Sequence, residues 1–257
     1  KQSCGRAMVL AIALTLMQRG RFNLARALSL LLFLFLLAMS GSRTFWLVGL
    51  SVFALAFFMN FIKRYDLTSR AIIVLISVVL SIVIITASVM FGAEILALLG
   101  RDTTLTGRTD IWQAVWQSIL KRPMLGYGFA GFWIGMKGEA INVIASVLWD
   151  VPHAHNGFLE IMLQLGVIGM AIFILSYLRA CSRAWTMIRS QYIEQAIWPI
   201  FALFLILICN LDENTLLSFN GIFWVIYIVA LVNLELMVPL VAQVPVRRVA
   251  TLWAVRE

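Results

Sequence analysis

The chain has 257 residues, of which 62% are hydrophobic and 12% are charged, whereas about 25% of the residues in a typical soluble domain are charged. This composition excludes a water-soluble globular protein, and the lack of short alternating apolar and polar segments excludes a transmembrane β-barrel. The net charge of +8 does not indicate nucleic-acid binding, because the basic residues are spread among the connecting segments. The sequence therefore predicts an all-α, polytopic transmembrane helix bundle.

Seven apolar runs, each with at most one charged residue, approach or reach the ~20 apolar residues that a helix needs to cross a bilayer. They predict spans at residues 7–18, 27–42, 44–62, 71–93, 156–178, 195–211 and 221–237. The first run is too short for a full crossing, and the chain starts with Lys1 rather than Met. We therefore expect a longer protein with further spans at its amino end.

A long polar segment separates the fourth and fifth predicted spans. We expect four amino-terminal helices in residues 1–93, a large loop at 94–154, three carboxy-terminal helices in 155–238 and a basic cytoplasmic tail at 239–257. Of the 20 Lys and Arg residues, 12 fall in one alternate set of connections, which includes that tail. Because positively charged loops are retained in the cytoplasm, the loop at 94–154 is expected on the exterior face.

An amphipathic helix is predicted inside this loop, over the sequence TDIWQAVWQSILKRP. Thr109 or Asp110 can cap its start, and Pro123 ends it. Its apolar residues form one broad stripe with two indoles, which favours a helix lying flat on the outer leaflet. The following sequence MLGYGFAGFWIG contains the spacing G-x-G-x-x-G but follows no strand, so a flexible loop facing lipid is expected rather than a dinucleotide site.

Arg43 lies in SGSRT, between the second and third predicted spans. The two runs leave almost no residues for a turn, so Arg43 is expected at or inside the outer headgroup boundary. An ionisable residue so close to hydrocarbon is a candidate functional residue. Alternatively, its side chain snorkels to a lipid phosphate.

The only two histidines of the chain, His153 and His155, occur together in VPHAHNGFLE, where the long loop enters the fifth span. Pro152 and the polar residues after it predict the start of a helix. His155 is therefore expected near a helix N-terminus, where free N–H groups attract anions such as phosphate and where a neutral imidazole can accept a proton. In the alternative interpretation, both histidines are merely polar residues of the membrane interface.

The spacing of residues within the fifth span predicts a shared helix face. His155 and Gly166 are 11 residues apart, so a regular helix places them on one face, with Gly169 about 40° away. This face is either a site of close helix packing or a groove for a long lipid chain. Glu160 shares a face with Asn156 and is expected to snorkel or to pair with an arginine.

The sequence HNGFLEIMLQLGVIG resembles the pattern H-[NSQ]-x9-G-x-x-[GTY] of the superfamily of O-antigen ligases and O-antigen or exopolysaccharide polymerases. His155, Asn156, Gly166 and Gly169 occupy its defining positions. The segments SGSRT, GRTDIW and RPMLGYG also resemble motifs of this superfamily, and the likeness extends over about residues 40–214. Members are usually longer at the amino end, and these motifs do not separate ligases from polymerases.

The resemblance implies a GT-C-like, inverting glycosyltransferase at the exterior, periplasmic face of a bacterial inner membrane. Its donor would be a glycan carried on undecaprenyl diphosphate, and its acceptor a second glycan or lipid A–core. It also implies a reaction without a metal or another cofactor, which agrees with the lack of a D-x-D motif in the sequence.

The resemblance also implies roles for individual residues. His155 looks like the catalytic residue that activates the acceptor hydroxyl, while Arg43 and Arg108 look like the residues that bind the diphosphate. Guanidinium groups suit this role because they stay charged and bind phosphate oxygens bidentately. Asp212 and Glu213 match an acidic position that follows the next span in many members. The candidates for supporting roles are Asn156, Glu160, Asp212 and Glu213.

A transporter or channel for an anionic solute is the main alternative, since outward-facing arginines and histidines can form a solute pathway between helices. Transporters commonly place such residues near the bilayer midplane, whereas here the candidates lie at the outer boundary of the predicted spans. A structural membrane subunit would leave this outer polar cluster without a purpose. The sequence thus favours a glycosyltransferase.

Overall fold

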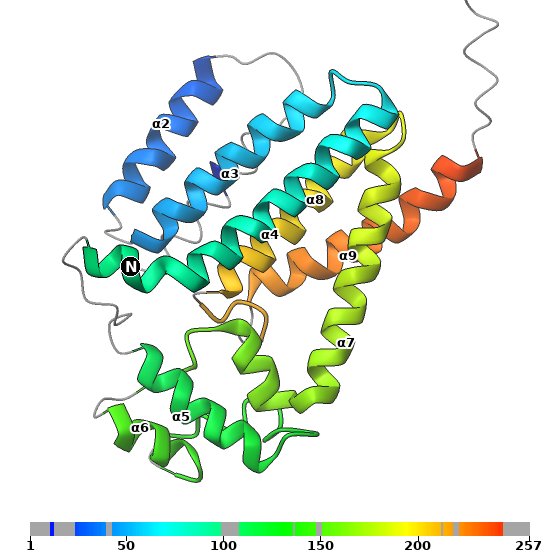
Figure 1. Ribbon diagram of the computed structural model, residues 1–257. Coiled ribbons are helices and arrows are strands. Elements are labelled where there is room, and N and C mark those ends of the chain that lie inside the picture. The colour runs from blue at the N-terminus through cyan, green and yellow to red at the C-terminus, as the bar shows by residue number, and fades with distance from the viewer. Residues whose placement is uncertain are drawn as a thin grey trace, which may run out of the picture.

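The computed structural model describes residues 11–12, 24–39, 43–98, 108–135, 137–147, 151–211, 213–217 and 221–243, without the side chains of residues 43–44, 82, 84–85, 87–98 and 240–243. Within these ranges the chain forms helices and no strands. The helices are α2 (Leu24–Met39), α3 (Arg43–Ile62), α4 (Leu67–Leu98), α5 (Arg108–Lys121), α6 (Ala140–Val147), α7 (Gly157–Ile188), α8 (Ile193–Asn210) and α9 (Ile222–Gln243) (Figure 1). The all-α fold class is thus confirmed for the described part of the chain.

Several of these helices are long and apolar enough to cross a membrane. Among the described residues they are Phe45–Ile62 in α3, Gly157–Ile188 in α7, Ile193–Asn210 in α8 and Ile222–Pro239 in α9. The helix α2 and the first part of α4, Leu67–Ser81, are shorter apolar helices. The first predicted span lies outside the described residues, apart from 11–12. The chain is therefore part of a polytopic, integral membrane protein.

Two helices extend well beyond the apolar runs that predicted them, and charged residues in these extensions have partners in other elements. In the first turn of α4, the Arg70 guanidinium donates a hydrogen bond to the carbonyl oxygen of Ser190 at 3.2 Å. In α7, Arg179 donates to the carboxylate of Glu235 in α9, and Arg183 forms an ion pair with the same carboxylate. Compensated charges do not interrupt a helix, so α4 begins at Leu67 and α7 continues to Ile188.

The centre of the bundle is formed by α7, α8 and α9, with α3 packed against α8. Large side chains of three of these helices are fully buried there, among them Phe45 of α3, Phe201 of α8 and Tyr227 of α9. By contrast, Phe35 of α2 and Ile76 of α4 are each 60% exposed. Apolar side chains that point out of such a bundle are the ones that lipid covers.

The connections at one end of the bundle contact one another. The Nζ atom of Lys63, after α3, lies 2.8 Å from the Oε1 atom of Glu194 at the start of α8, and Arg70 contacts Ser190 as described above. Both connections belong to the basic set for which a cytoplasmic location is expected. Their contact fits the alternation of the predicted spans, while the side of the membrane on which they lie stays a prediction.

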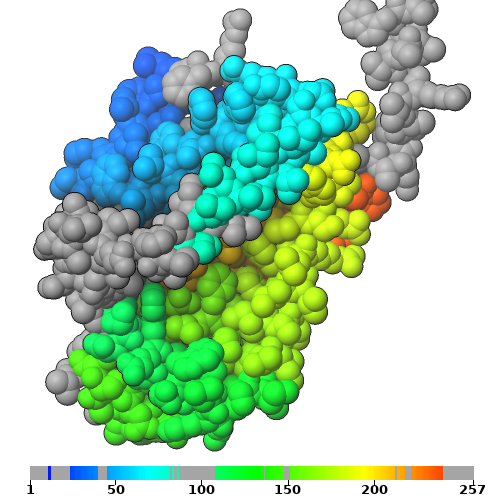
Figure 2. Space-filling view, viewed as in Figure 1, coloured from blue at the N-terminus to red at the C-terminus, as the bar shows by residue number. Residues whose placement is uncertain are grey.

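The opposite end of the bundle carries the α5–α6 layer, which consists of α5, α6 and the intervening residues 122–139 (Figure 1). In the space-filling view this green layer forms one end of the molecule, beside the yellow-green residues of α7 (Figure 2). It has its own apolar cluster, which packs against Leu163 of α7. The cluster includes Val115 of α5, Val143 of α6 and Phe132 from the segment between these helices. The layer is thus fixed to the start of α7.

The helix predicted at residues 109–122 is present as α5, but only part of its apolar stripe is exposed. Ile111, Val115 and Ile119 are buried inside the α5–α6 layer, while Trp116 and Leu120 of the same stripe are 44% and 54% exposed. The stripe packs against α6, a helix of eight residues that the sequence analysis did not predict. A partner within the protein therefore takes the place of the outer leaflet for most of this face.

Candidate active site

The fifth predicted span is interrupted at Gly166, which has φ 65° and ψ −166° inside α7. The interruption frees backbone groups, and the segment after α5 binds to them. The N–H of Val167 donates to the carbonyl oxygen of Pro123 at 2.8 Å, and the N–H of Tyr127 donates to the carbonyl oxygen of Leu163 at 3.0 Å. Glycine is needed because an added Cβ atom would overlap the carbonyl group of Met124. The glycine-rich loop is therefore docked against α7 rather than flexible.

This interruption changes the structural role that the glycine spacing was expected to have. The predicted face shared by His155 and Gly166 assumed a regular helix, which α7 is not at that point. Gly169, the second glycine of the motif, lies in the next turn, where an added Cβ atom would overlap the Cβ atom of Leu165. The expectation of one regular helix face shared by His155 and Gly166 is thus wrong, because α7 is kinked at Gly166. Figure 1 shows the change of direction within α7.

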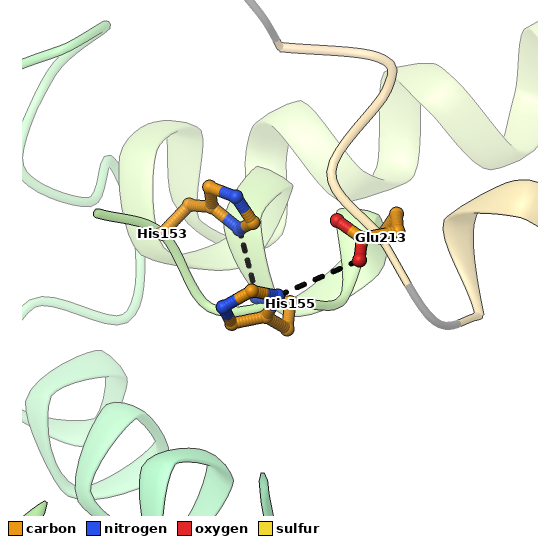
Figure 3. A group of neighbouring side chains, drawn as sticks. All are labelled: His153, His155 and Glu213. Carbon is orange, nitrogen blue, oxygen red and sulfur yellow. Dashed lines mark hydrogen bonds and ion pairs between the residues drawn. The ribbon is translucent and has the colours of Figure 1, made fainter. Parts of the chain in front are cut away.

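His153 and His155 lie together in the short segment before α7 (Figure 3). Their ring centroids are 4.2 Å apart, and the backbone N–H of His155 donates to the Nδ1 atom of His153 at 3.2 Å. His155 has a φ of 51°, a left-handed conformation that is uncommon for residues other than glycine. Such conformations cost about 1–3 kcal/mol and are found most often at functional sites. The backbone at His155 is therefore held in place by its surroundings.

Asn156 begins α7 as its N-cap, as the sequence predicts for the start of the helix. Its side-chain oxygen accepts hydrogen bonds from the N–H groups of Phe158 and Leu159 at 3.0 and 3.1 Å. Its side-chain nitrogen donates to the carbonyl oxygen of Leu211 at 3.2 Å. The same side chain thus caps α7 and ties it to the segment that follows α8.

Glu213, in the connection between α8 and α9, faces His155 (Figure 3). Its Oε1 atom lies 3.7 Å from the Nδ1 atom of His155 and 3.7 Å from the Nη2 atom of Arg108, the first residue of α5. The Glu213 side chain is only 2% exposed. Three segments that are distant in the sequence therefore bring a histidine, a carboxylate and a guanidinium together.

Asn210, at the end of α8, holds the segment that carries Glu213. Asn210 is fully buried, and its side-chain oxygen accepts a hydrogen bond from the N–H of Thr215 at 3.0 Å. Its side-chain nitrogen donates to the hydroxyl of Thr215 at 2.6 Å and to the carbonyl oxygen of Ile206 at 2.7 Å. Gly157 leaves the space that this amide occupies, since an added Cβ atom would overlap it. The sequence analysis missed Asn210, although a polar residue at the end of an apolar span was a visible signal.

Glu160 neither snorkels nor pairs with an arginine, so that expectation is wrong. It is fully buried and accepts hydrogen bonds from the indole nitrogen of Trp133 at 2.8 Å, from the backbone N–H of Ala154 at 2.9 Å and from the side-chain amide of Gln164 at 2.6 Å. The indole nitrogen of Trp112 donates to the carbonyl oxygen of Ala154 at 3.0 Å. Glu160 therefore fixes the residue that precedes His155.

The structure does not describe the side chains of two predicted site residues. Arg43 begins α3, but its side chain lies outside the described residues, as does Asp212 as a whole. Arg108, His155 and Glu213 lie within one group of contacts, and Asn156, which follows His155 in the chain, contacts Leu211.

A metal ion was not expected from the sequence, yet three side chains lie close enough to hold one. One ring nitrogen each of His153 and His155 and one carboxylate oxygen of Glu213 lie within 4.8 Å of one another. Chemically, the cluster offers a proton acceptor, an anion beside it and a fixed cation.

A family model described as O-antigen ligase matches residues 28–174, which is more than half of the chain. The chain belongs to the O-antigen ligase family. The matched region includes Arg43, Arg108 and the whole His155 motif, whereas Glu213 lies beyond it.

Named relatives of this O-antigen ligase family member are known from two groups of bacteria. The chain is 28% identical over 180 residues to "Exopolysaccharide production protein ExoQ" of Rhizobium meliloti, a stretch that covers 66% of this chain and 40% of that protein. It is 39% identical over 70 residues to "Putative polysaccharide ligase RT0347" of Rickettsia typhi, which covers 26% of this chain and 17% of that protein. The chain thus spans less than half the length of these relatives.

Proposed function

We propose that the protein is a membrane glycosyltransferase that transfers or polymerises an oligosaccharide carried on undecaprenyl diphosphate. The reaction takes place at the outer face of the bacterial inner membrane, inverts the anomeric carbon and needs no metal. Support comes from the family, from the names of the relatives, which refer to exopolysaccharide production and polysaccharide ligation, and from the membrane helices.

One observation carries the proposal: the buried carboxylate of Glu213 lies 3.7 Å from both the imidazole of His155 and the guanidinium of Arg108. A general base is most effective when a second group orients it and stabilises the charge that it gains. A distance of 3.7 Å is longer than a hydrogen bond, and catalytic contacts of this kind often shorten only when the substrate binds.

In the proposed reaction, the hydroxyl oxygen of the acceptor attacks the anomeric carbon of the donor from the face opposite the diphosphate. A new carbon–oxygen bond forms as the bond between the anomeric carbon and the phosphate oxygen breaks. The hydroxyl proton passes to Nε2 of His155, because Nδ1 faces Glu213. Glu213 then stabilises the imidazolium, and undecaprenyl diphosphate leaves with the electron pair of the broken bond.

The arginines are assigned to the leaving group. Charge develops on the diphosphate as the bond breaks, so a cation fixed beside it lowers the barrier. Arg108 offers five N–H donors, and its side chain is 23% exposed, so it can contact phosphate while one edge faces Glu213. Arg43 would contribute a second guanidinium from the start of α3, and Asp212 would support Glu213.

The acceptor distinguishes the two activities within the family. A polymerase transfers the growing glycan to another lipid-linked glycan, whereas a ligase transfers it to lipid A–core. Deletion of the gene, followed by gel analysis of cell-surface polysaccharide, tests the proposal. A polymerase predicts loss of long chains with single units retained, and a ligase predicts long chains that stay lipid-linked and unattached. A polysaccharide pattern that the deletion leaves unchanged would contradict both.

A further inference from the structure

The residues around His155 have a second property that transfer does not require. His153, His155 and Glu213 place two ring nitrogens and one carboxylate oxygen within 4.8 Å of one another (Figure 3). We propose that this group binds a zinc-type divalent ion reversibly and that the bound ion inhibits transfer. The proposal that the ion binds rests on the geometry alone, whereas the proposal that it inhibits transfer rests on the proposed function of His155.

The number and type of ligands fit a zinc ion that is not fully enclosed. Zinc is bound by imidazole nitrogen and carboxylate oxygen at about 2.0–2.2 Å, and open sites commonly have three protein ligands and one further position. Ligand atoms around one ion are therefore about 3–4 Å apart in tetrahedral geometry. The distance between Nδ1 of His155 and Oε1 of Glu213 is already 3.7 Å. All three ligand atoms lie within 4.8 Å of one another, so the side chains would have to move closer together by about 1 Å to share one ion.

The choice of metal follows from the ligands. Imidazole suits zinc, copper, nickel and iron, whereas magnesium and calcium prefer oxygen ligands. A site with two imidazoles and one carboxylate should therefore bind zinc and discriminate against magnesium. His153 and His155 are each partly exposed as whole residues, whereas the Glu213 side chain is only 2% exposed, so the ion would be bound at the edge of the protein interior.

Arg108 limits how tightly the ion can bind. Its Nη2 atom lies 3.7 Å from the same Glu213 oxygen, and its positive charge repels a dication at short range. The carboxylate has a second oxygen and further lone pairs with which it can face both cations. This arrangement favours an ion that enters and leaves over a permanently bound cofactor, and it is compatible with metal-independent transfer.

Inhibition follows from the competition for His155. Zinc bonded to Nδ1 of His155, the nitrogen that faces Glu213, leaves the one proton of the neutral ring on Nε2, so Nε2 can no longer accept the proton of the acceptor hydroxyl. An ion held between His155 and Glu213 also separates the base from the carboxylate that stabilises its charge. The dication would in addition draw Glu213 away from Arg108. Zinc should therefore lower the turnover number, and removal of zinc by a chelator should restore it.

Direct binding of zinc tests the site without any reliance on activity. The full-length protein in detergent is titrated with zinc in competition with a chromophoric chelator, in a background in which Cys4 and Cys181 are serine, because Cys181 is exposed. We expect one zinc ion per chain and at least about tenfold weaker binding in His153→Ala, since even outer-shell changes cost 10- to 100-fold in metal affinity. His155→Ala and Glu213→Gln should show the same loss.

Two controls make this titration decisive. Glu139→Gln removes a carboxylate of the α5–α6 layer that pairs with Lys121 at 2.6 Å, and it should leave zinc affinity unchanged. Magnesium should not displace zinc. Zinc affinity that stays the same in His153→Ala, His155→Ala and Glu213→Gln would overturn the site, as would the absence of competition with the chelator.

Transfer assays with and without zinc then test whether the bound ion inhibits transfer. We expect zinc to slow the parent protein and His153→Ala to need at least about tenfold more zinc for the same inhibition. If zinc binds at this site but saturating zinc leaves transfer unchanged, inhibition is excluded. If the parent protein shows no transfer even without zinc, the proposed function fails, while the binding titration still decides whether the metal site exists.

Discussion

At the scale of single residues, the site depends on a carboxylate that an imidazole and a guanidinium share. Glu213 is nearly inaccessible to solvent, yet it lies next to both His155 and Arg108. A buried carboxylate is costly unless its charge is compensated, and Arg108 supplies a permanent positive charge. Glu213 therefore has a positively charged partner in Arg108 that is independent of His155.

The arginines are expected to act through their planar shape as well as their charge. Lysine carries the same charge but lacks the fork that binds two phosphate oxygens. Arg108→Lys and Arg43→Lys should each lower transfer in membranes, at unchanged protein level. Arg122→Lys is the matched control, because Arg122 follows the other end of α5 from Arg108 and lies over the ring of Tyr127. Parental activity in both Arg108→Lys and Arg43→Lys would remove the diphosphate-binding role.

The charge of Glu213 can be tested apart from its shape. Glu213→Gln keeps the size of the side chain and removes its charge, and a hydrogen bond to a charged group contributes about 1.5–3 kcal/mol, or roughly 10- to 100-fold in rate. We expect a loss of this size in the turnover number of the purified protein. Glu139→Gln should have no comparable effect. If turnover is the same in both variants, Glu213 does not support the base.

At the scale of elements, the structure gives the glycine motif a different physical basis from the predicted one. The sequence placed the start of α7 correctly, because Pro152 and Asn156 are recognisable signals of a helix N-terminus. It could not reveal the interruption at Gly166, since a single glycine in an apolar run is compatible with a continuous helix. The hydrogen bonds that stabilise the interruption come from Pro123 and Tyr127, about 40 residues earlier, and periodicity does not report such long-range contacts.

The interruption predicts an unusual sensitivity at Gly166. Gly166→Ala requires a side chain at φ 65° and overlaps the Met124 carbonyl group, so it should lose more than the ~1–3 kcal/mol of backbone strain alone. Gly128→Ala is the control, because φ at Gly128 is 88° but no atom lies within 4 Å of the added Cβ. Thermal unfolding in detergent should show the larger loss for Gly166→Ala. Equal melting temperatures for the two variants would contradict the docked-loop arrangement.

At the scale of the whole molecule, the membrane helices were predictable and the contacts between their ends were not. Long uncharged runs are a direct consequence of burial in lipid, so the runs at 44–62 and 195–211 correspond closely to α3 and α8. The pairing of Glu213 with Arg108 joins residues that are 105 positions apart, and no pattern in one sequence encodes it. The eight-residue helix α6 was missed because its apolar residues are too few to stand out from a loop.

The orientation of the bundle in the membrane can be tested directly. The α5–α6 layer should be exterior, while the connection between α7 and α8 should be cytoplasmic, because the basic connections fall in one alternate set. We expect an impermeant thiol reagent on intact cells to label Ala145→Cys and not Gln191→Cys, both of which are exposed positions. The background lacks Cys4 and the exposed Cys181. The reverse labelling pattern would overturn the assigned orientation.

The central claim is that His155 is the base that activates the acceptor, and one comparison tests it most directly. Transfer from a lipid-linked donor is measured with purified, folded protein carrying either His155→Ala or His153→Ala. General-base catalysis contributes about 100- to 10,000-fold, so His155→Ala should nearly abolish transfer. His153→Ala should cost far less, although both rings lie in the same segment, 4.2 Å apart. Equal residual activity in the two variants would contradict the catalytic role of His155.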